Sequence, residues 1–253
     1  MATISDVQKY IEELAPTENK CAWDNDGLQV CDDAQRDTDK ILLCLDVTDA
    51  AIDEAIKMGA GLIVSHHPLI FDPLKAINCE TPEARLCLRM LKNGISHIAA
   101  HTRLDKANEG VNETLAELMG ITDKAYFGEE DIGIIGNITP SGCKNIALFA
   151  KEKLGVPSVS YVLGEKSISR LAVVCGAGKD FLYDAHLEGA DALLTGDVSY
   201  TAFMIAKRLG IALIDAGHFY TEFPILEVLS KKLCKNFPNI QTKIHKEAII
   251  EEV

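Results

Sequence analysis

The sequence predicts an α/β protein made of two related lobes with mainly parallel strands. Three observations lead to this prediction. Short apolar runs alternate with segments of helical periodicity that have recognisable caps. Histidines and carboxylates recur directly after the apolar runs. The two halves of the chain also align with each other, which indicates an internal duplication of one α/β lobe.

The composition favours a cytoplasmic protein. The 253 residues, 47% of them hydrophobic, are enough for a sizeable core in one large domain or two lobes. A net charge of -13 disfavours nucleic acid as a partner. The eight cysteines form no CxxC pair and fit a reducing compartment. We find no signal peptide and no apolar run of the ~20 residues that a membrane span needs.

The first lobe is expected over residues 1–122. Thr48 and Gly59 bracket one of its helices, and Thr81-Pro82-Glu83 is a helix start with a cap, an N1 proline and a first-turn acid. The elements expected in this lobe are helices at 5–14, 49–58, 81–92 and 109–119 and strands at 40–46, 61–65 and 95–100.

A stretch rich in turn residues, 123–143, joins the first lobe to a second one that we expect over residues 123–253. Strands again alternate with helices of similar length. Thr221 is the expected cap of the last helix, and Pro224 fits its first turn. The elements expected in this lobe are helices at 144–154, 180–188, 199–208 and 221–233 and strands at 158–163, 170–175, 192–195, 211–216 and 240–244.

The internal repeat places chemically similar residues at equivalent strand ends. The aligned segments are 40–45 with 170–175, 59–67 with 189–197, and 94–101 with 210–218. His67 falls opposite Asp197, and both His101 and His218 are followed four residues later by a carboxylate. Chance similarity between two βαβ units is the alternative explanation. The matched pairs favour two related lobes whose strand ends face one site.

The stretch Gly61–Leu69 is the centre of this pattern. Its apolar run ends in Ser65, His66 and His67, and Pro68 stops further strand pairing. Ligands bind at the carboxyl ends of strands in open α/β sheets. Adjacent side chains of an extended segment point in opposite directions, so two neighbouring histidines suit two metal ions better than one. The alternative is a polar loop with two solvated histidines.

Histidine together with carboxylate is the ligand mixture of zinc, manganese, iron, cobalt or nickel. Two such ions ~3.5–4 Å apart would activate a water and clamp a substrate. A lone histidine is more simply explained as a satisfied polar residue, but six candidates at expected strand ends favour a metal site. They are His66, His67, His101, Asp105, His218 and Glu222. Of the other histidines, His97 is expected in the core and His186 and His245 in solvent.

Five short motifs in order carry a family resemblance. They are Trp23-Asp-Asn-x-Gly27, Ser65-His-His-Pro68, His101-Thr-x-Leu-Asp105, Thr195-Gly-Asp197 and Gly217-His-Phe-x-Thr-Glu222. Together they resemble the Nif-three-like family, often labelled GTP cyclohydrolase 1 type 2 homologues. The resemblance spans nearly the whole chain. It implies a toroidal homohexamer with a dinuclear metal site in each subunit, facing the central cavity.

The resemblance also implies a role for each candidate. Carried over by position, the ligands of two divalent ions between the lobes would be His66, His67, Asp105, His218 and Glu222, with Glu222 bridging. His101 would lie beside them and move protons. The chain departs from the family at two positions. Asp26 stands where a small apolar residue is common, and Thr201 stands where a histidine is common.

Two functions from different classes follow. The first is a dinuclear metal-dependent hydrolase of the GTP cyclohydrolase 1 type 2 homologue type. It would act on a nucleotide-like or other small substrate through metal-bound hydroxide, with His101 as the catalytic group. The alternative is a non-catalytic metal-binding ring protein that serves as a carrier or interaction partner. The acidic charge and the threonine at position 201 leave room for that alternative.

Overall fold

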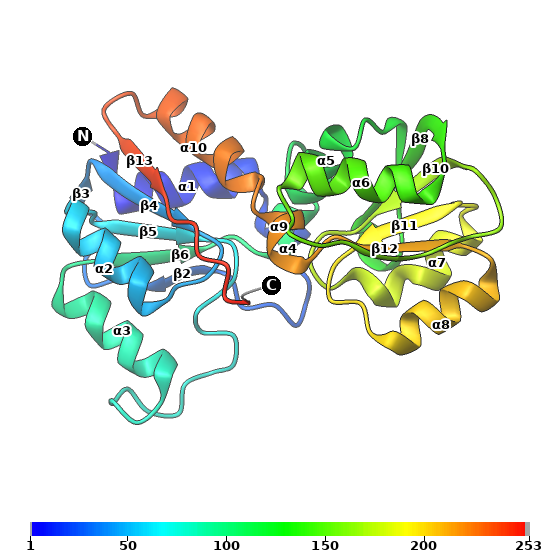
Figure 1. Ribbon diagram of the computed structural model, residues 1–253. Helices are drawn as coiled ribbons and strands as arrows, with labels where there is room; N and C mark the ends of the chain where they lie inside the picture. The colour runs from blue at the N-terminus through cyan, green and yellow to red at the C-terminus, as the bar shows by residue number, and fades with distance from the viewer. Residues whose placement is uncertain (1, 251–253) are drawn as a thin grey trace. The chain divides into compact units, whose positions relative to one another are not determined.

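The computed structural model describes residues 2–250, and the chain divides into two compact units. The first unit runs to Asn108 and takes in Leu226–Glu247 (Figure 1). The second unit is Glu109–Ile225 together with the chain from Ala248. This division differs from the boundary at 122/123 that we drew from the sequence. Helix α5 (Val111–Leu118) belongs to the second unit because it packs against β8, β10 and α9.

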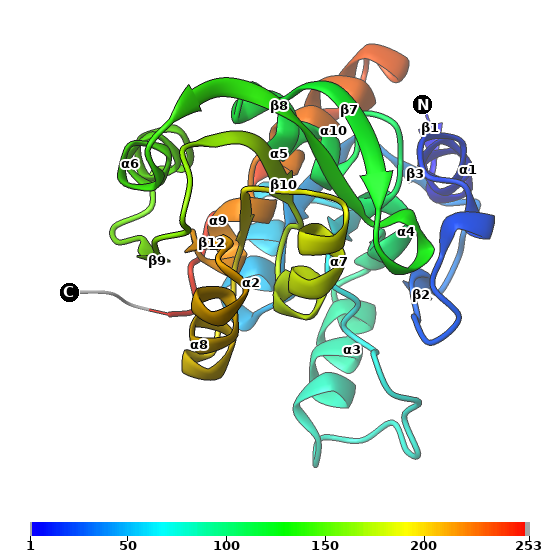
Figure 2. The ribbon, with the colours of Figure 1, turned by 90° about the vertical axis from the view of Figure 1, so that its right-hand side faces the viewer.

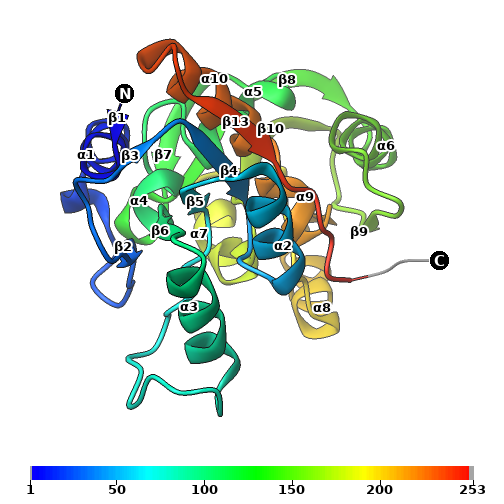
Figure 3. The same ribbon diagram turned by 90° about the vertical axis from the view of Figure 1, so that its left-hand side faces the viewer.

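The first unit contains a five-stranded sheet in the order β13-β4-β5-β6-β2. Its inner pairs are parallel, and only β2 is antiparallel to its neighbour β6. Strand β13 returns from the end of the chain to lie beside β4 (Figure 3). The strands are β2 (Gly27–Val30), β4 (Lys40–Cys44), β5 (Leu62–Ser65), β6 (Ser96–Ala99) and β13 (Gln241–Ile244), with a separate small pair β1 (Ala2–Thr3) and β3 (Asp37–Thr38).

Helices cover both faces of this sheet (Figure 1). Helices α2 and α3 bury an apolar cluster against one face, where Leu42 and Ile63 are fully buried. Helices α1 and α10 cover the other face, toward which the alternate residues Ile41 and Leu43 point. The helices of this unit are α1 (Ile4–Leu14), η1 (Thr17–Asn19), α2 (Asp49–Met58), α3 (Pro82–Lys92), α4 (Thr102–Asp105) and α10 (Ile225–Asn236).

The second unit contains a six-stranded mixed sheet in the order β7-β8-β10-β11-β12-β9. Only its centre, β10-β11-β12, is parallel. The order and direction of these three strands match those of β4-β5-β6, as the sequence repeat predicts. The strands are β7 (Thr122–Phe127), β8 (Gly133–Ser141), β9 (Ser160–Val162), β10 (Ile168–Val173), β11 (Ala192–Thr195) and β12 (Ala212–Asp215).

Helices α7 and α8 cover one face of the second sheet and α5 and α6 the other (Figure 1). The α7–α8 side buries Leu182, Ala185 and Ala206 against Leu193 and Leu213. The helices of this unit are α5, η2 (Glu129–Asp131), α6 (Cys143–Leu154), η3 (Gly178–Phe181), α7 (Leu182–Leu187), α8 (Tyr200–Leu209) and α9 (His218–Glu222).

Two expectations about secondary structure were wrong. The stretch 123–143 is not a linker, because β7 and β8 form an antiparallel hairpin there that is prominent in Figure 2. The helix expected at 221–233 is two helices. Helix α9 ends at Glu222 and α10 begins at Ile225, since Pro224 cannot continue the hydrogen-bond pattern of α9.

The other histidines behave partly as expected. His97 is fully buried in β6, and His186 is exposed on α7. His245 was expected in solvent, but it is half-buried and bonded to Glu54 and Glu247. Within residues 2–250, no helix has both the length and the apolar character that crossing a membrane requires.

Candidate metal centre

The carboxyl edge of the first sheet presents the predicted histidines. Strand β5 ends at Ser65, and the backbone N–H groups of His66 and His67 still bond to the carbonyls of Cys44 (3.1 Å) and Leu45 (2.9 Å). His101 lies two residues after the end of the neighbouring strand, β6. Parallel strands end at the same edge of a sheet, which is why side chains far apart in the sequence meet there.

Three imidazoles come together at this edge. The ring centroids of His66 and His67 are 5.0 Å apart, and the ring of His101 is 5.3 Å from His66 and 5.7 Å from His67. One nitrogen of each lies within 4.8 Å of one nitrogen of the others. We expected His66 and His67 to point in opposite directions. That expectation was wrong because the extended strand stops at Ser65, and the chain bends at both histidines.

Each of these rings is held by a hydrogen bond at Nδ1. His66 bonds to the carbonyl of Ala100 at 2.8 Å, His67 to Asp46 at 2.8 Å and His101 to Asp24 at 2.9 Å. Carbonyl and carboxylate oxygens only accept, so each Nδ1 carries the proton and each Nε2 keeps its lone pair. This is the arrangement by which proteins orient metal-binding histidines.

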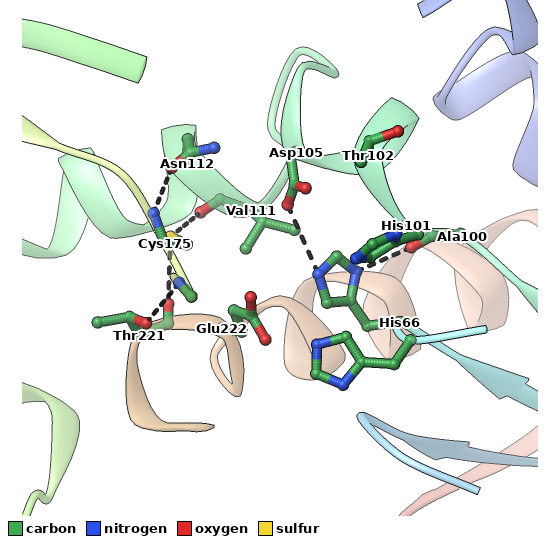
Figure 4. A network of polar contacts seen from close by, with 12 residues as sticks. His66, Ala100, His101, Thr102, Asp105, Val111, Asn112, Cys175, Thr221 and Glu222 are labelled. Atoms are coloured by element: carbon green, nitrogen blue, oxygen red, sulfur yellow. Dashed lines mark hydrogen bonds and ion pairs between the residues drawn. The ribbon is translucent and has the colours of Figure 1, made fainter. Parts of the chain in front are cut away.

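Asp105 lies at the end of the short helix α4, one turn after His101. Its Oδ1 is 3.5 Å from Nε2 of His66. A dashed line marks this contact in Figure 4. Two ligand atoms of one tetrahedral metal ion are about 3.3 Å apart, given metal–ligand distances of about 2.0–2.1 Å. The separation of these two atoms therefore fits a shared ion.

The partner of His101 is a buried carboxylate. Asp24 accepts hydrogen bonds from Nδ1 of His101 and from both the backbone N–H and the hydroxyl of Thr102. Burial alone would raise the pKa of Asp24, but the bonds from His101 and Thr102 outweigh it and lower the pKa to about 2. Asp24 is thus a permanent anion that fixes the orientation of His101.

The second unit presents a histidine–carboxylate pair. His218 and Glu222 are one turn apart on α9, with Nε2 of His218 3.2 Å from Oε2 of Glu222. The Nδ1 of His218 bonds to Asp197 at 2.7 Å. Asp197 lies two residues after the end of β11 and has a positive φ of 52°. The Nδ1 of His218 is therefore bonded to an acceptor oxygen, as the Nδ1 atoms of the three histidines of the first unit are.

A network of buried bonds fixes α9 within the second unit (Figure 4). The backbone N–H of Cys175 donates to Asn112 at 2.7 Å, and that of Gly176 donates to the hydroxyl of Thr221 at 3.0 Å. Thr221 in turn donates to the carbonyl of His218 at 2.8 Å. These bonds hold the helical turn that carries His218 and Glu222.

The two departures from the family pattern have different surroundings. Asp26 is paired with the buried guanidinium of Arg103 at 2.8 Å and also accepts the backbone N–H of His101 at 3.2 Å. Asp26 therefore has a structural partner close to the site. Thr201 is exposed in the first turn of α8.

Sequence reasoning missed the groups that bond to the histidine Nδ1 atoms. Asp46 and Asp24 were not singled out as site residues. Asp46 follows β4, which pairs with β5, and Asp24 precedes β2, which pairs with β6. A signal was present, because both acids stand close to strand ends at the same sheet edge. The carbonyl of Ala100 gives no such signal, since every residue has one.

The donor atoms fit a divalent transition metal. The first unit offers three histidine Nε2 atoms and the carboxylate of Asp105, and the second offers His218 and Glu222. Nitrogen and carboxylate oxygen together suit zinc, manganese, iron, cobalt or nickel rather than calcium or magnesium.

An α/β chain with histidines and acids at its strand ends belongs to the broad class of proteins with a candidate transition-metal site. More narrowly, this chain belongs to the Duf34/NIF3 (NGG1p interacting factor 3) family, whose model matches residues 2–251.

Named relatives and solved structures agree with this placement. A protein of Clostridium perfringens named GTP cyclohydrolase 1 type 2 homolog is 36% identical over 97% of both chains. One of Helicobacter pylori named GTP cyclohydrolase 1 type 2 is 34% identical over 88% of both. The crystal structure of a hypothetical protein of Staphylococcus aureus superposes with a TM-score of 0.89 at 26% identity and covers 99% of both chains.

Proposed function

We propose that the protein is a metal-dependent hydrolase of the GTP cyclohydrolase 1 type 2 homologue type, acting on a nucleotide-like or other small substrate. The ligands of two divalent ions would be His66, His67, Asp105, His218 and Glu222, with Glu222 bridging. The observation that carries the proposal is that four histidines are all bonded through Nδ1. Each has Nδ1 bonded to a carbonyl or carboxylate, so that Nε2 can bind a metal.

Bound divalent ions would supply an activated water and polarise the substrate. The chain's own contribution is proton transfer by His101. Its Nδ1 is committed to Asp24, so Nε2 is the atom that takes up or delivers a proton. The ionised Asp24 accepts from Nδ1 of His101 and so fixes the tautomer and the orientation of the ring.

A non-catalytic metal-binding ring protein is the second candidate. The observation in its favour is the exposed threonine at position 201, where the family resemblance leads one to expect a histidine. Such a carrier would bind metal through the same residues. It would not depend on His101 for any turnover.

We further propose that the chain assembles into a toroidal homohexamer. Several large apolar side chains of the second unit are exposed, among them Leu148 (53%), Leu187 (80%) and Tyr200 (80%), and assembly would give such groups a place to bury. Light scattering should then report a mass about six times the 27.5 kDa of one chain. A monomeric mass would refute this assembly.

The first experiment is elemental analysis of protein purified without chelators or a metal-binding tag. We expect about two metal ions per chain, and their loss in a His66→Ala/Glu222→Ala double variant. His186→Ala, an exposed histidine on α7, is the matched control and should retain the metal. Protein without metal even after reconstitution would refute the proposal.

Turnover separates the two candidate functions. Metal-loaded wild type and His101→Ala would be compared on a panel of nucleotides, cyclic amides and phosphoesters. A hydrolase loses about 10²–10⁴-fold in rate in His101→Ala while keeping its metal. If no member of the panel is turned over by the metal-loaded wild type, the carrier is the better account.

A further inference from the structure

Two aromatic side chains beside His101 are unusually exposed. Trp23 is 60% exposed and Phe71 is 47% exposed, although both lie next to His101 at the sheet edge. The Trp23 and Phe71 ring centroids are 6.0 Å apart. Each is also close to the ring of His101, at 6.2 Å for Trp23 and 6.4 Å for Phe71. Exposure of large rings at a chemically active corner indicates a binding surface.

The three rings form a corner of defined shape. Trp23 and Phe71 are tilted by 48° from each other, and both are nearly perpendicular to His101, at 75° and 81°. Because of this tilt, a flat ligand ring cannot be sandwiched between Trp23 and Phe71. A flat ring can instead stack on the indole face while its edge points toward the imidazole of His101.

The loop that carries Phe71 is fixed by hydrogen bonds. The amide of Gln29 binds both backbone groups of Ile70, accepting from its N–H at 3.0 Å and donating to its carbonyl at 2.9 Å. Asn25, from the segment that follows Trp23, donates to the same carbonyl at 2.6 Å. These bonds tie the two aromatic residues into one surface, which reduces the entropy lost when a ligand binds.

We propose that Trp23 and Phe71 form a stacking subsite for the flat heteroaromatic ring of the substrate, a purine or a ring of similar size, next to His101. Aromatic side chains bind such rings by their π-faces, largely independently of the ring's substituents. Phe71 also lines a surface pocket of about 470 Å³ with Leu74 and Lys75, which gives room for a substituent on the ring. That this ring belongs to a substrate rests on the proposed function, whereas ring binding itself does not.

Trp23 is the single tryptophan of the chain, so its fluorescence reports this subsite alone. We would titrate the protein with guanosine 5′-monophosphate and, separately, with ribose 5-phosphate, exciting at the red edge of indole absorption. The two probes differ only by the base. We expect saturable quenching by the nucleotide and none by the sugar phosphate.

Variants test whether the nucleotide binds at Trp23 and Phe71. Phe71→Ala should weaken nucleotide binding about tenfold, and Trp23→Leu, measured by equilibrium dialysis, by about tenfold or more. Tyr183→Leu, at another exposed tyrosine of the second unit, is the matched control and should bind as wild type does. The oligomeric mass should be the same in all variants.

The titration is repeated on protein stripped of metal and on His66→Ala. Quenching that survives there supports the stacking subsite even if the hydrolase proposal fails. Turnover without any dependence on Trp23 or Phe71 would leave the hydrolase standing and overturn the subsite. Equal quenching by both probes, no quenching by either, or a change of oligomeric mass in Phe71→Ala would also overturn it.

Discussion

Gly176 lies so close to Glu222 that a side chain at position 176 would collide with it. A Cβ atom there would be 2.2 Å from Oε1 of Glu222 and 3.2 Å from Nε2 of His218. The backbone of Gly176 also has a φ of +63°, which favours glycine. The absence of a side chain thus gives the histidine–carboxylate pair of α9 the space it occupies.

Gly176→Ala should therefore displace Glu222 and lower metal content. The matched control is Gly155→Ala, which has a similar φ of +67° but no atom within 4 Å of the added Cβ. Both variants should lose about 1–2 kcal/mol of stability from backbone strain. Only Gly176→Ala should also lose metal, as measured by elemental analysis. Full metal content in Gly176→Ala would contradict this role of the glycine.

Asp46 should tune metal affinity without binding metal. It holds Nδ1 of His67 at 2.8 Å, and loss of such a partner typically costs about 10–100-fold in metal affinity. We expect Asp46→Ala to show that loss in a competition titration against a chelator. Asp39→Ala, exposed just before the opposite end of β4, should bind metal as the wild type does. Equal affinities in the two variants would refute the role assigned to Asp46.

The Asp26–Arg103 pair should be important for stability. The side chain of Arg103 is 1% exposed and that of Asp26 is 2% exposed, at a distance of 2.8 Å. Removing one member of such a pair leaves a buried charge and costs about 3–5 kcal/mol. Asp26→Ala should lose that much in urea unfolding, and Asp26→Ala/Arg103→Met should recover part of the loss.

The control for this prediction is an exposed ion pair of the same chemistry. Arg36 and Asp32 are 2.7 Å apart, but their side chains are 29% and 48% exposed. Asp32→Ala should change stability by less than about 1 kcal/mol because solvent screens the pair. If the two aspartate variants lose equal stability, burial is not what makes the Asp26–Arg103 pair important.

The sequence predicted the parts of the fold that have strong local patterns. Strands β4, β5 and β11 are largely apolar and buried, and β10 ends in a buried apolar run. All four were predicted within a few residues. Strands β7 and β8 were missed. All of β7 except Phe127 is exposed, and the glycines of β8 resemble turn residues. Their strand structure comes from pairing with each other and with β10, which no local pattern reveals.

The same limit applies to the site. His66, His67, His101 and His218 were found because each follows an apolar run. The shared direction of His66 and His67 could not be predicted, because it depends on where the strand stops and the chain bends. The bond from His66 to the carbonyl of Ala100 depends on the pairing of β5 with β6.

His97 should make the stability of the protein depend on pH. Burial lowers the pKa of His97 to about 3. Its Nε2 is 2.7 Å from the hydroxyl of Ser65, which donates to the carbonyl of His67 at 2.6 Å and so accepts from the ring. The neutral ring thus supports the turn that carries His66 and His67.

Whether stability rises or falls with pH follows from the protonation of His97 in the folded and the unfolded protein. An unfolded chain protonates His97 below a pH of about 6.5, whereas the folded protein does not until a pH of about 3. The contribution of His97 is therefore complete above pH 6.5 and is lost as the pH falls, by about 2 kcal/mol between pH 6.5 and 5. The stability of wild type minus that of His97→Gln, from urea unfolding, should decline over this range. The same stability difference for His186→Gln, at an exposed histidine, should not change with pH. If the difference for His97→Gln does not change with pH either, the buried ring takes up its proton as readily as an exposed one.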